Sequence, residues 1–164
     1  MNLSSTFLTA AATLSLCACA VIEGDRTPSP GAVFDQYVQA VHAADMPAVR
    51  ALIDSKVERS DFVGCRPEMD NPACLAHYIE ATVVRPGARL TEVGRQVDGD
   101  TITVDLEVRS PLYVKAGAER IRGRDVLRVQ EGRITSFRFI PDFKDEPTVV
   151  FFGSLGIGPR AKKR

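Results

Sequence analysis

The chain of 164 residues has no tryptophan, only two histidines and four cysteines, and its 21 basic residues are balanced by 21 acidic ones. Balanced charge argues against a dedicated nucleic-acid binder, which normally has a basic excess. The sequence contains no internal repeat, no glycine-rich phosphate loop and no Gly-x-Ser-x-Gly motif, so the usual signatures of repeat proteins, nucleotide-binding enzymes and serine hydrolases are missing. With 45% hydrophobic and 26% charged residues, the composition is that of one globular domain.

The first 22 residues are typical of an export signal. The uncharged stretch from Phe7 to Ile22 is 16 residues long, which suits the apolar core of a signal peptide and is short of the about 20 residues of a membrane span. The alternative is a buried N-terminal helix. Two cleavage sites compete: Leu16-Cys17-Ala18-Cys19 resembles the bacterial lipoprotein signal, and Ala18-Cys19-Ala20 fits an ordinary signal-peptidase site. We favour lipid modification at Cys19, because the polar GDRTPSPG after it would serve as a tether.

Two cysteines, Cys65 and Cys74, remain after this leader. In an oxidising compartment an even pair nine residues apart predicts a disulfide, which would stabilise the fold by about 2.5–3 kcal/mol in the chain-entropy model. Zinc is the rival interpretation. Only His77 lies nearby, however, and no second Cys-x-x-Cys or histidine cluster accompanies the pair. The sequence therefore predicts neither a metal centre nor a cofactor.

Helices are predicted in the first half of the folded part. Apolar residues recur there at helical spacing, Asp45 and Pro47 are typical of a helix start, and Asn71-Pro72 opens another helix. The predicted helices cover 31–44, the stretch from 45 to about 53, and 72–83. Residues 56–63 form a short, ambiguous strand. The only histidines, His42 and His77, fall on these helices, where a half-exposed structural role is commoner than that of a base.

From residue 88 the apolar period changes to two, which indicates strands with one buried face. The predicted strands are 89–97, 101–108, 119–129 and 133–140. Asp98-Gly99-Asp100 and Glu131-Gly132 mark hairpin turns, and an extra strand is expected at Val149–Phe152, before a basic tail. Helices followed by an antiparallel meander predict an α+β domain, with the helices on one face of a curved sheet.

This layout resembles the nuclear transport factor 2-like superfamily, which includes ketosteroid isomerase and the SnoaL-like polyketide cyclases. The likeness spans about residues 33–140 and is carried by VFDQYVQAVHAADMPAVRALI, the helix after Asn71-Pro72, and GRDVLRVQEGRITSFRFIPDF. It implies a cystatin-like cone of three helices and a curved sheet around a pocket open at one end. The corresponding divisions are a lipoprotein-type signal peptide (1–19), a linker (20–31), the domain (32–143) and a C-terminal extension (144–164). The scaffold serves catalysts, binders and secretion parts alike, so fold alone does not fix function.

The resemblance also implies three candidate catalytic residues. In ketosteroid isomerase a tyrosine and a protonated aspartate form the oxyanion hole, and a second aspartate moves the proton. Tyr37 in VFDQY falls at the family's tyrosine, Asp125 in RDVLRV at its strand aspartate, and Asp61 at its base. Asp61 departs from the family pattern, because Phe62 follows it where the isomerases have proline. A shift of one residue would place Arg59 at the base position and remove the chemistry.

Strand alternation supports Asp125 independently of the resemblance. Asp125 shares its face with Ile121, Gly123, Leu127 and Val129, whereas the opposite face carries Arg120, Arg122, Arg124 and Arg128. A carboxyl on an apolar face is desolvated, which favours its neutral, hydrogen-bond-donating form. The alternative is that Asp125 only accepts from Tyr37 or a backbone amide and fixes the core. The arginine face is expected to be solvated and matched to Asp105 and Glu107, or to contact an acidic partner or lipid headgroups.

The sequence leaves three functions open. The favoured one is a binding or accessory module, lipid-anchored in the bacterial cell envelope, whose pocket holds a small apolar molecule or nothing. The second is an isomerase- or cyclase-type enzyme that moves a proton next to a carbonyl, with Tyr37 and Asp125 as oxyanion donors and Asp61 as base. The third is a structural part of an envelope or secretion assembly, suggested by the apolar VVFF segment and the KKR tail. A secreted or periplasmic soluble form and a homodimer formed through the sheet stay open, and no nucleic-acid partner is expected.

Overall fold

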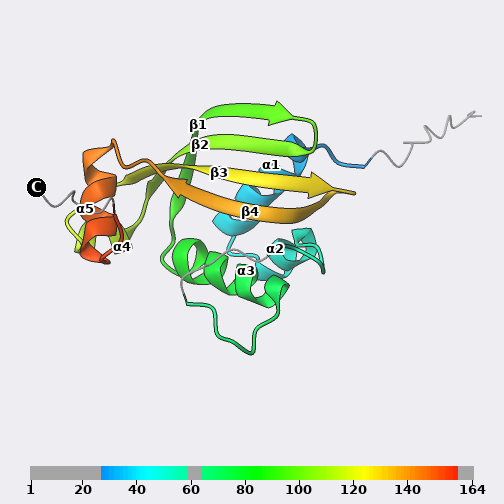
Figure 1. Ribbon diagram of the computed structural model, residues 1–164, viewed down its shortest axis with the longest axis horizontal. Helices are drawn as coiled ribbons and strands as arrows, with labels where there is room; N and C mark the ends of the chain where they lie inside the picture. The colour runs from blue at the N-terminus through cyan, green and yellow to red at the C-terminus, as the bar shows by residue number, and fades with distance from the viewer. Residues whose placement is uncertain (1–26, 59–63, 159–164) are drawn as a thin grey trace, which may run out of the picture.

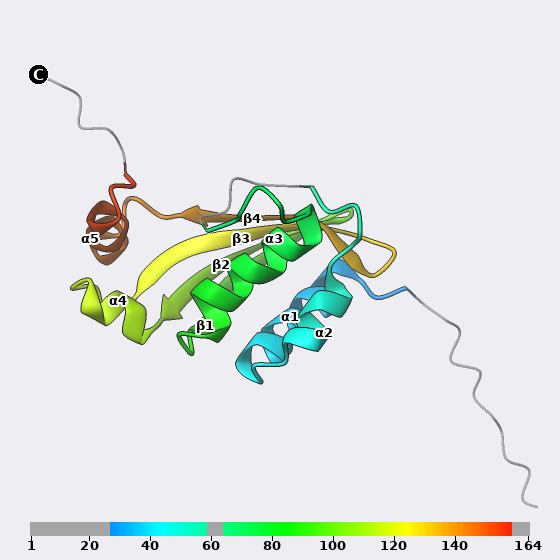
Figure 2. The same ribbon diagram turned by 90° about the horizontal axis from the view of Figure 1, so that it is seen from below.

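A computed structural model describes residues 27–58 and 64–158 and shows the predicted α+β arrangement. One antiparallel sheet has the strand order β1 (Arg89–Asp98), β2 (Thr101–Arg109), β3 (Ile121–Gln130) and β4 (Arg133–Pro141). One face of the sheet is covered by α1 (Pro30–His42), α2 (Met46–Leu52) and α3 (Asn71–Ile79), and a π-helical turn, η1 (Glu80–Val84), follows α3 (Figures 1 and 2). Two short helices, α4 (Pro111–Lys115) and α5 (Glu146–Ser154), lie at one end of the sheet (Figure 1).

The three N-terminal helices begin where the sequence provides caps. In each case a side-chain oxygen accepts a hydrogen bond from a backbone amide of the first turn, and a proline follows the cap within that turn. The capping pairs are Ser29 with Ala32 (3.2 Å), Asp45 with Ala48 (2.9 Å) and Asp70 with Ala73 (2.8 Å). The predicted helix over 72–83 is therefore present, divided into α3 and η1. No helix among the described residues has the length and hydropathy needed to span a bilayer.

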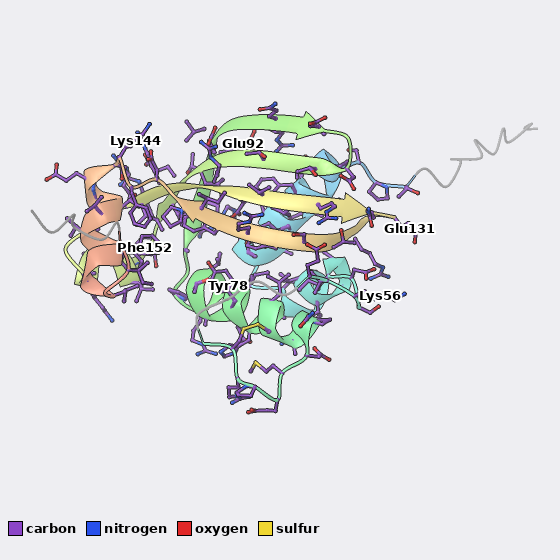
Figure 3. The ribbon with its side chains drawn as sticks, in the orientation of Figure 1. Lys56, Tyr78, Glu92, Glu131, Lys144 and Phe152 are labelled. Carbon is purple, nitrogen blue, oxygen red and sulfur yellow. A yellow bond between two sulfur atoms is a disulfide. The ribbon has the colours of Figure 1, made fainter. Side chains whose placement is uncertain are left out.

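The predicted Cys65–Cys74 disulfide is present, with the two Cα atoms 5.2 Å apart, and Figure 3 shows it beside α3. Cys74 is fully buried on α3, so the bridge ties the loop before this helix to the core. The bond occupies both sulfurs. Within residues 27–58 and 64–158, no cluster of three or more histidine, cysteine, aspartate or glutamate side chains could hold a metal ion.

The core lies between the inner face of the sheet and α1–α3. The strand β2 shows the alternation that the sequence predicts, with Ile102, Val104, Leu106 and Val108 buried. At the end of α1, His42 Nε2 accepts a hydrogen bond from the Leu90 backbone N–H at 3.1 Å. Burial and the nearby Arg89 lower the pKa of His42, which keeps the imidazole neutral and able to accept. His42 thus joins α1 to β1 in a structural role.

The outer face of the sheet carries the predicted match between arginines and acids. Arg122 pairs at 3.1 Å with Glu107, whose side chain is 19% exposed. Two exposed pairs are Arg124 with Asp105 (3.4 Å) and, not predicted, Arg128 with Glu58 (2.9 Å). Solvent screens such pairs, so each contributes little to stability. Arg120 differs, because its side chain is only 15% exposed and it also pairs with Asp145 at the start of α5.

One local prediction is wrong, a second falls mostly outside the described residues, and one element was missed. The strand expected at Val149–Phe152 is wrong, because these residues lie within α5. Asp145 caps that helix by accepting from the Thr148 amide, and this start signal outweighs the β propensity of VVFF. The part of 56–63 that is described, 56–58, forms no strand, although the Glu58 amide donates to the Thr135 carbonyl of β4 at 2.8 Å. The short helix α4 had no periodic signal.

Candidate ligand-binding cavity

A cavity of about 290 Å³ lies between the sheet and the helices, towards the end that carries α4 and α5. This volume is at the small end of the range of roughly 300–1,000 Å³ typical of small-molecule sites. Apolar side chains form most of its wall: Val83, Leu90, Leu106, Val108, Leu112, Ile121, Phe137, Phe139, Phe151, Phe152, Leu155 and Ile157. The polar groups that line it are Tyr37, Tyr78, Thr82, Tyr113 and Asp125. Such a wall favours a mostly apolar ligand held in place by a few polar contacts.

Among the described residues that line the cavity, Asp125 is the only one with a carboxyl group. It lies on β3 between Val104 of β2 and Phe139 of β4 and is 3% exposed. No described residue donates a hydrogen bond to this carboxyl. Every described polar side-chain atom that is fully enclosed has a partner, so the Asp125 oxygens are not fully enclosed. The carboxyl oxygens therefore face the open space of the cavity. Burial alone raises the pKa of Asp125 to about 7, so the group is a neutral acid below that pH.

Three tyrosines from three helices surround this acid. Burial, and then the nearby charge of Asp125, raises the pKa of Tyr37 on α1 well above its ordinary value and that of Tyr78 on α3 to about 12. Burial also raises the pKa of Tyr113 on α4, with smaller effects of Tyr78 and Asp125. The three phenols therefore stay protonated at neutral pH and can donate hydrogen bonds. Figure 3 shows Tyr78 on the side of α3 that faces the sheet.

An aromatic wall from β4 and α5 closes the cavity beside Asp125. The rings of Phe139 and Phe152 are stacked with centroids 6.4 Å apart. The Phe139 ring lies directly over Gly123, where an added Cβ would be 2.5 Å from the ring and 2.7 Å from the Ile140 carbonyl oxygen. Only glycine leaves room for the ring at that position. Figure 3 shows Phe152 on the side of α5 that faces the sheet.

A buried polar network holds α5 in place over the cavity. Thr148 is fully buried, and its Oγ1 accepts from the Arg122 backbone N–H of β3 at 2.7 Å. The Asp145 carboxylate accepts from the Thr148 hydroxyl and from the Arg120 guanidinium, both at 2.7 Å. Although burial acts to raise it, these hydrogen bonds hold the pKa of Asp145 below its ordinary value. The network fixes the helix whose following residues complete the cavity wall.

The structure brings two of the three predicted catalytic residues, Tyr37 and Asp125, into one cavity. The third, Asp61, and the predicted lipidation site, Cys19, lie outside the described residues. Sequence analysis missed Tyr78 and Tyr113 as cavity residues. Tyr78 could have been found on the apolar side of its helix, whereas Tyr113 lies in a helix that the sequence pattern does not indicate.

The architecture defines a class: an α+β cone with a cavity between its helices and its curved sheet. The chain has the nuclear transport factor 2-like fold, as the sequence resemblance predicts. A protein of unknown function with this fold from Cytophaga hutchinsonii superposes with a TM-score of 0.54 at 11% identity, covering 74% of this chain and 96% of that one. The Δ5-3-ketosteroid isomerase of a Mycobacterium species gives a TM-score of 0.53 at 20% identity, covering 71% and 96%.

A third solved structure with this fold is a Mycobacterium tuberculosis protein in complex with estradiol-17β-hemisuccinate. It has a TM-score of 0.53 at 19% identity and covers 68% of this chain and 93% of its own. No protein-family model matches the sequence, and no curated protein matches it. Likeness at these identities establishes the fold, and the function has to be argued from the cavity.

Proposed function

We propose that this protein is an exported, lipid-anchored binding or accessory domain whose cavity holds a small, largely apolar molecule with one oxygen function. The observation that carries the proposal is the Asp125 carboxyl, which faces an apolar cavity without a hydrogen-bond partner among the described residues. A buried polar group without a partner costs about 1–3 kcal/mol. A ligand that covers this carboxyl and supplies a hydrogen-bond partner avoids this cost, whereas a purely hydrocarbon ligand incurs it.

The protonation of the site sets the kind of oxygen it prefers. Below about pH 7 the Asp125 carboxyl is neutral and can donate, and the phenols around it are donors as well. Converging donors favour an acceptor that carries partial negative charge, such as a ketone oxygen, an enolate or a phenolate. The neighbours support this choice: one is a ketosteroid isomerase, and another is in complex with an estradiol derivative.

The test of ligand binding uses 2-naphthol and its ketone analogue 2-tetralone, titrated by calorimetry at pH 6. Wild type is expected to bind both. Asp125→Asn keeps a donor and most of the shape and should retain binding, whereas Asp125→Leu should lose it. Arg124→Leu on the same strand, whose side chain lies on the outer face, is the matched control. The proposal fails if wild type binds neither compound, or if Asp125→Leu binds as tightly as wild type.

The proposed location rests on the leader alone. Leu16-Cys17-Ala18-Cys19 and the polar tether after it support lipid attachment at Cys19 in the bacterial cell envelope. Cys19→Ala should move the protein from the membrane fraction to the soluble fraction of the producing bacterium. If wild type is itself soluble and its mature N-terminus follows Ala20, the ordinary signal peptidase cleaves it and the anchor is refuted.

A second candidate is an isomerase- or cyclase-type enzyme, favoured by the position of Tyr37 and Asp125 in one cavity. In such a reaction the Asp61 carboxylate takes a proton from the carbon next to a carbonyl. The C–H electron pair moves towards the carbonyl oxygen, and the resulting enolate is stabilised by the Tyr37 and Asp125 donors.

The discriminating measurement is exchange of the α-protons of 2-tetralone in deuterium oxide, followed by NMR. The enzyme hypothesis expects accelerated exchange in wild type, and loss of exchange with retained binding in Asp61→Asn. If wild type binds 2-tetralone without accelerating the exchange, the enzyme hypothesis fails and the binding function stands.

A further inference from the structure

The exposed apolar side chains of this protein are concentrated at the end that carries α4 and α5. Ten large hydrophobic side chains are exposed among the described residues, and six of them form what we call the apolar rim, with exposed fractions between 38% and 64%. The apolar rim consists of Leu112, Val114, Val149, Val150, Leu155 and Ile157. Clustered exposure of this kind marks an interaction site, whereas single exposed apolar residues do not.

The rim is continuous with the wall of the cavity. The two helices that carry it are packed together, because the Tyr113 and Phe151 rings are 4.6 Å apart, and Figures 1 and 2 both show α4 and α5 at the same end of the sheet. Leu112, Leu155 and Ile157 belong both to the rim and to the cavity lining. An apolar molecule could therefore pass from whatever covers the rim into the cavity without crossing water.

The charge next to the rim indicates what covers it. Ile157 is followed by Gly-Pro-Arg-Ala-Lys-Lys-Arg, which has four cations and no acid. The other charged residues within and beside α4 and α5 are Lys115, Glu119, Arg120, Asp142, Lys144, Asp145 and Glu146. Three cations against four acids leave that set close to neutral, so the excess of positive charge next to the rim is that of the sequence following Ile157. Apolar side chains beside a cluster of lysine and arginine are typical of a surface that binds anionic lipid headgroups.

We propose that the apolar rim docks on an anionic lipid bilayer and places the mouth of the cavity at the membrane surface. A lipid at Cys19 is compatible with this orientation, although the described chain begins at the other end of the sheet (Figure 1). Thr27 and Pro28 pack beside Gly132 at that far end, and the eight residues from Cys19 to Thr27 reach about 26–29 Å when extended. A ten-residue strand such as β3 is about 33 Å long, so the lipid and the apolar rim can meet the same bilayer when the sheet lies tilted towards it.

The missing tryptophan makes a site-specific test possible. In the full chain, Val114→Trp places one fluorophore in the rim, and Val97→Trp places one near the β1–β2 hairpin, at the opposite end of the sheet. Val114 is 64% and Val97 50% exposed. Both variants carry the same leader, so any membrane binding by the leader is common to both. Each is mixed with ligand-free vesicles of equal parts phosphatidylglycerol and phosphatidylcholine, with and without brominated acyl chains.

The emission of Val114→Trp should shift to shorter wavelength and lose intensity with brominated lipid, and the emission of Val97→Trp should do neither. Pure phosphatidylcholine or 1 M salt should reduce the Val114→Trp response, because the electrostatic part is screened. Val150→Trp, also in the rim, is the second probe if the melting temperature of Val114→Trp falls below that of wild type. Since the vesicles contain no ligand, a failure of the proposed ligand binding does not affect the result.

Three outcomes would overturn the docking proposal. The first is that the protein sediments with the vesicles while the emission of the rim tryptophan stays unchanged. The second is equal quenching of the Val114→Trp and Val97→Trp variants. The third is that the emission of the rim tryptophan shifts without vesicles as the protein concentration rises, and that analytical ultracentrifugation gives a doubled mass. This result would show that a second copy covers the rim.

Discussion

Replacing Asp125 by asparagine should change how the stability of the protein depends on pH. Burial raises the pKa of Asp125 from 3.8 to about 7, so between these values the folded state holds a proton that the unfolded state releases. Stability is then highest at low pH and falls as the pH rises through 7. A shift of about three units corresponds to roughly 4 kcal/mol, at about 1.4 kcal/mol per unit. Asparagine has no proton to lose, so this loss of stability should be absent from Asp125→Asn.

The assay is urea unfolding followed by circular dichroism at pH 5, 6, 7 and 8, with the disulfide intact. The free energy of unfolding of Asp125→Asn, relative to wild type, should rise across this range and approach a gain of several kcal/mol at pH 8. Asp105→Asn is the matched control, because Asp105 lies on the outer face with its side chain 57% exposed. It should run parallel to wild type.

Two results would refute the reasoning about Asp125. Identical pH dependence of wild type and Asp125→Asn would mean that the carboxyl is not a buried neutral acid. A variant that is less stable than wild type by the same amount at every pH would mean that the carboxyl is a fixed part of the core and not a group reserved for a ligand.

Three further predictions concern the walls of the cavity and the end of α1. Thr148→Val leaves a buried β3 amide without its acceptor and should lower the free energy of unfolding by about 1–3 kcal/mol. It should also weaken 2-naphthol binding in the same calorimetric titration, whereas Thr148→Ser should retain the stability and the binding. Gly123→Ala should displace the Phe139 ring, lower the stability by about 1–3 kcal/mol and lower the affinity for 2-naphthol. Gly153→Ala is the control, because its added Cβ meets nothing within 4 Å. Thermal melts and titrations should show neither effect in Gly153→Ala. The pKa of His42 is lowered on folding, so the stability that its neutral imidazole contributes is lost as the pH falls below about 6.5. His42→Gln should therefore flatten the pH dependence of the urea midpoint between pH 4 and 6.5. An unchanged pH dependence would contradict this.

The helices and strands that could be predicted are those whose signals are local. Ser29, Asp45 and Asp70 mark three helix starts by chemistry within one turn, and alternation over β2 and β3 places Asp125 on the buried face. The signal at Asp145 and Pro147 was also local, yet four β-favouring residues after it suggested a strand. The Asp145 cap and the packing of Thr148 on β3 together decide that segment in favour of α5.

The missed part of the site depends on contacts between distant segments. Thr148 holds α5 through a β3 amide 26 residues earlier in the chain, and no pattern within α5 indicates this pair. Tyr113 faces the cavity because α5 packs against α4. That no described residue donates a hydrogen bond to the Asp125 carboxyl is likewise a property of the assembled cavity and not of strand alternation.

The position of α5 in the sequence has a consequence for biosynthesis. Residues 146–157 leave the ribosome after the whole sheet, and they supply Phe151, Phe152, Leu155 and Ile157 to the cavity. A nascent chain that ends at Pro141 already carries Asp125 and the three tyrosines, but it lacks the aromatic side chains of α5 that line the cavity beside them. Under the proposed binding function, ligand loading is therefore a late event in the life of the chain, and cleavage between β4 and α5 is expected to release the ligand.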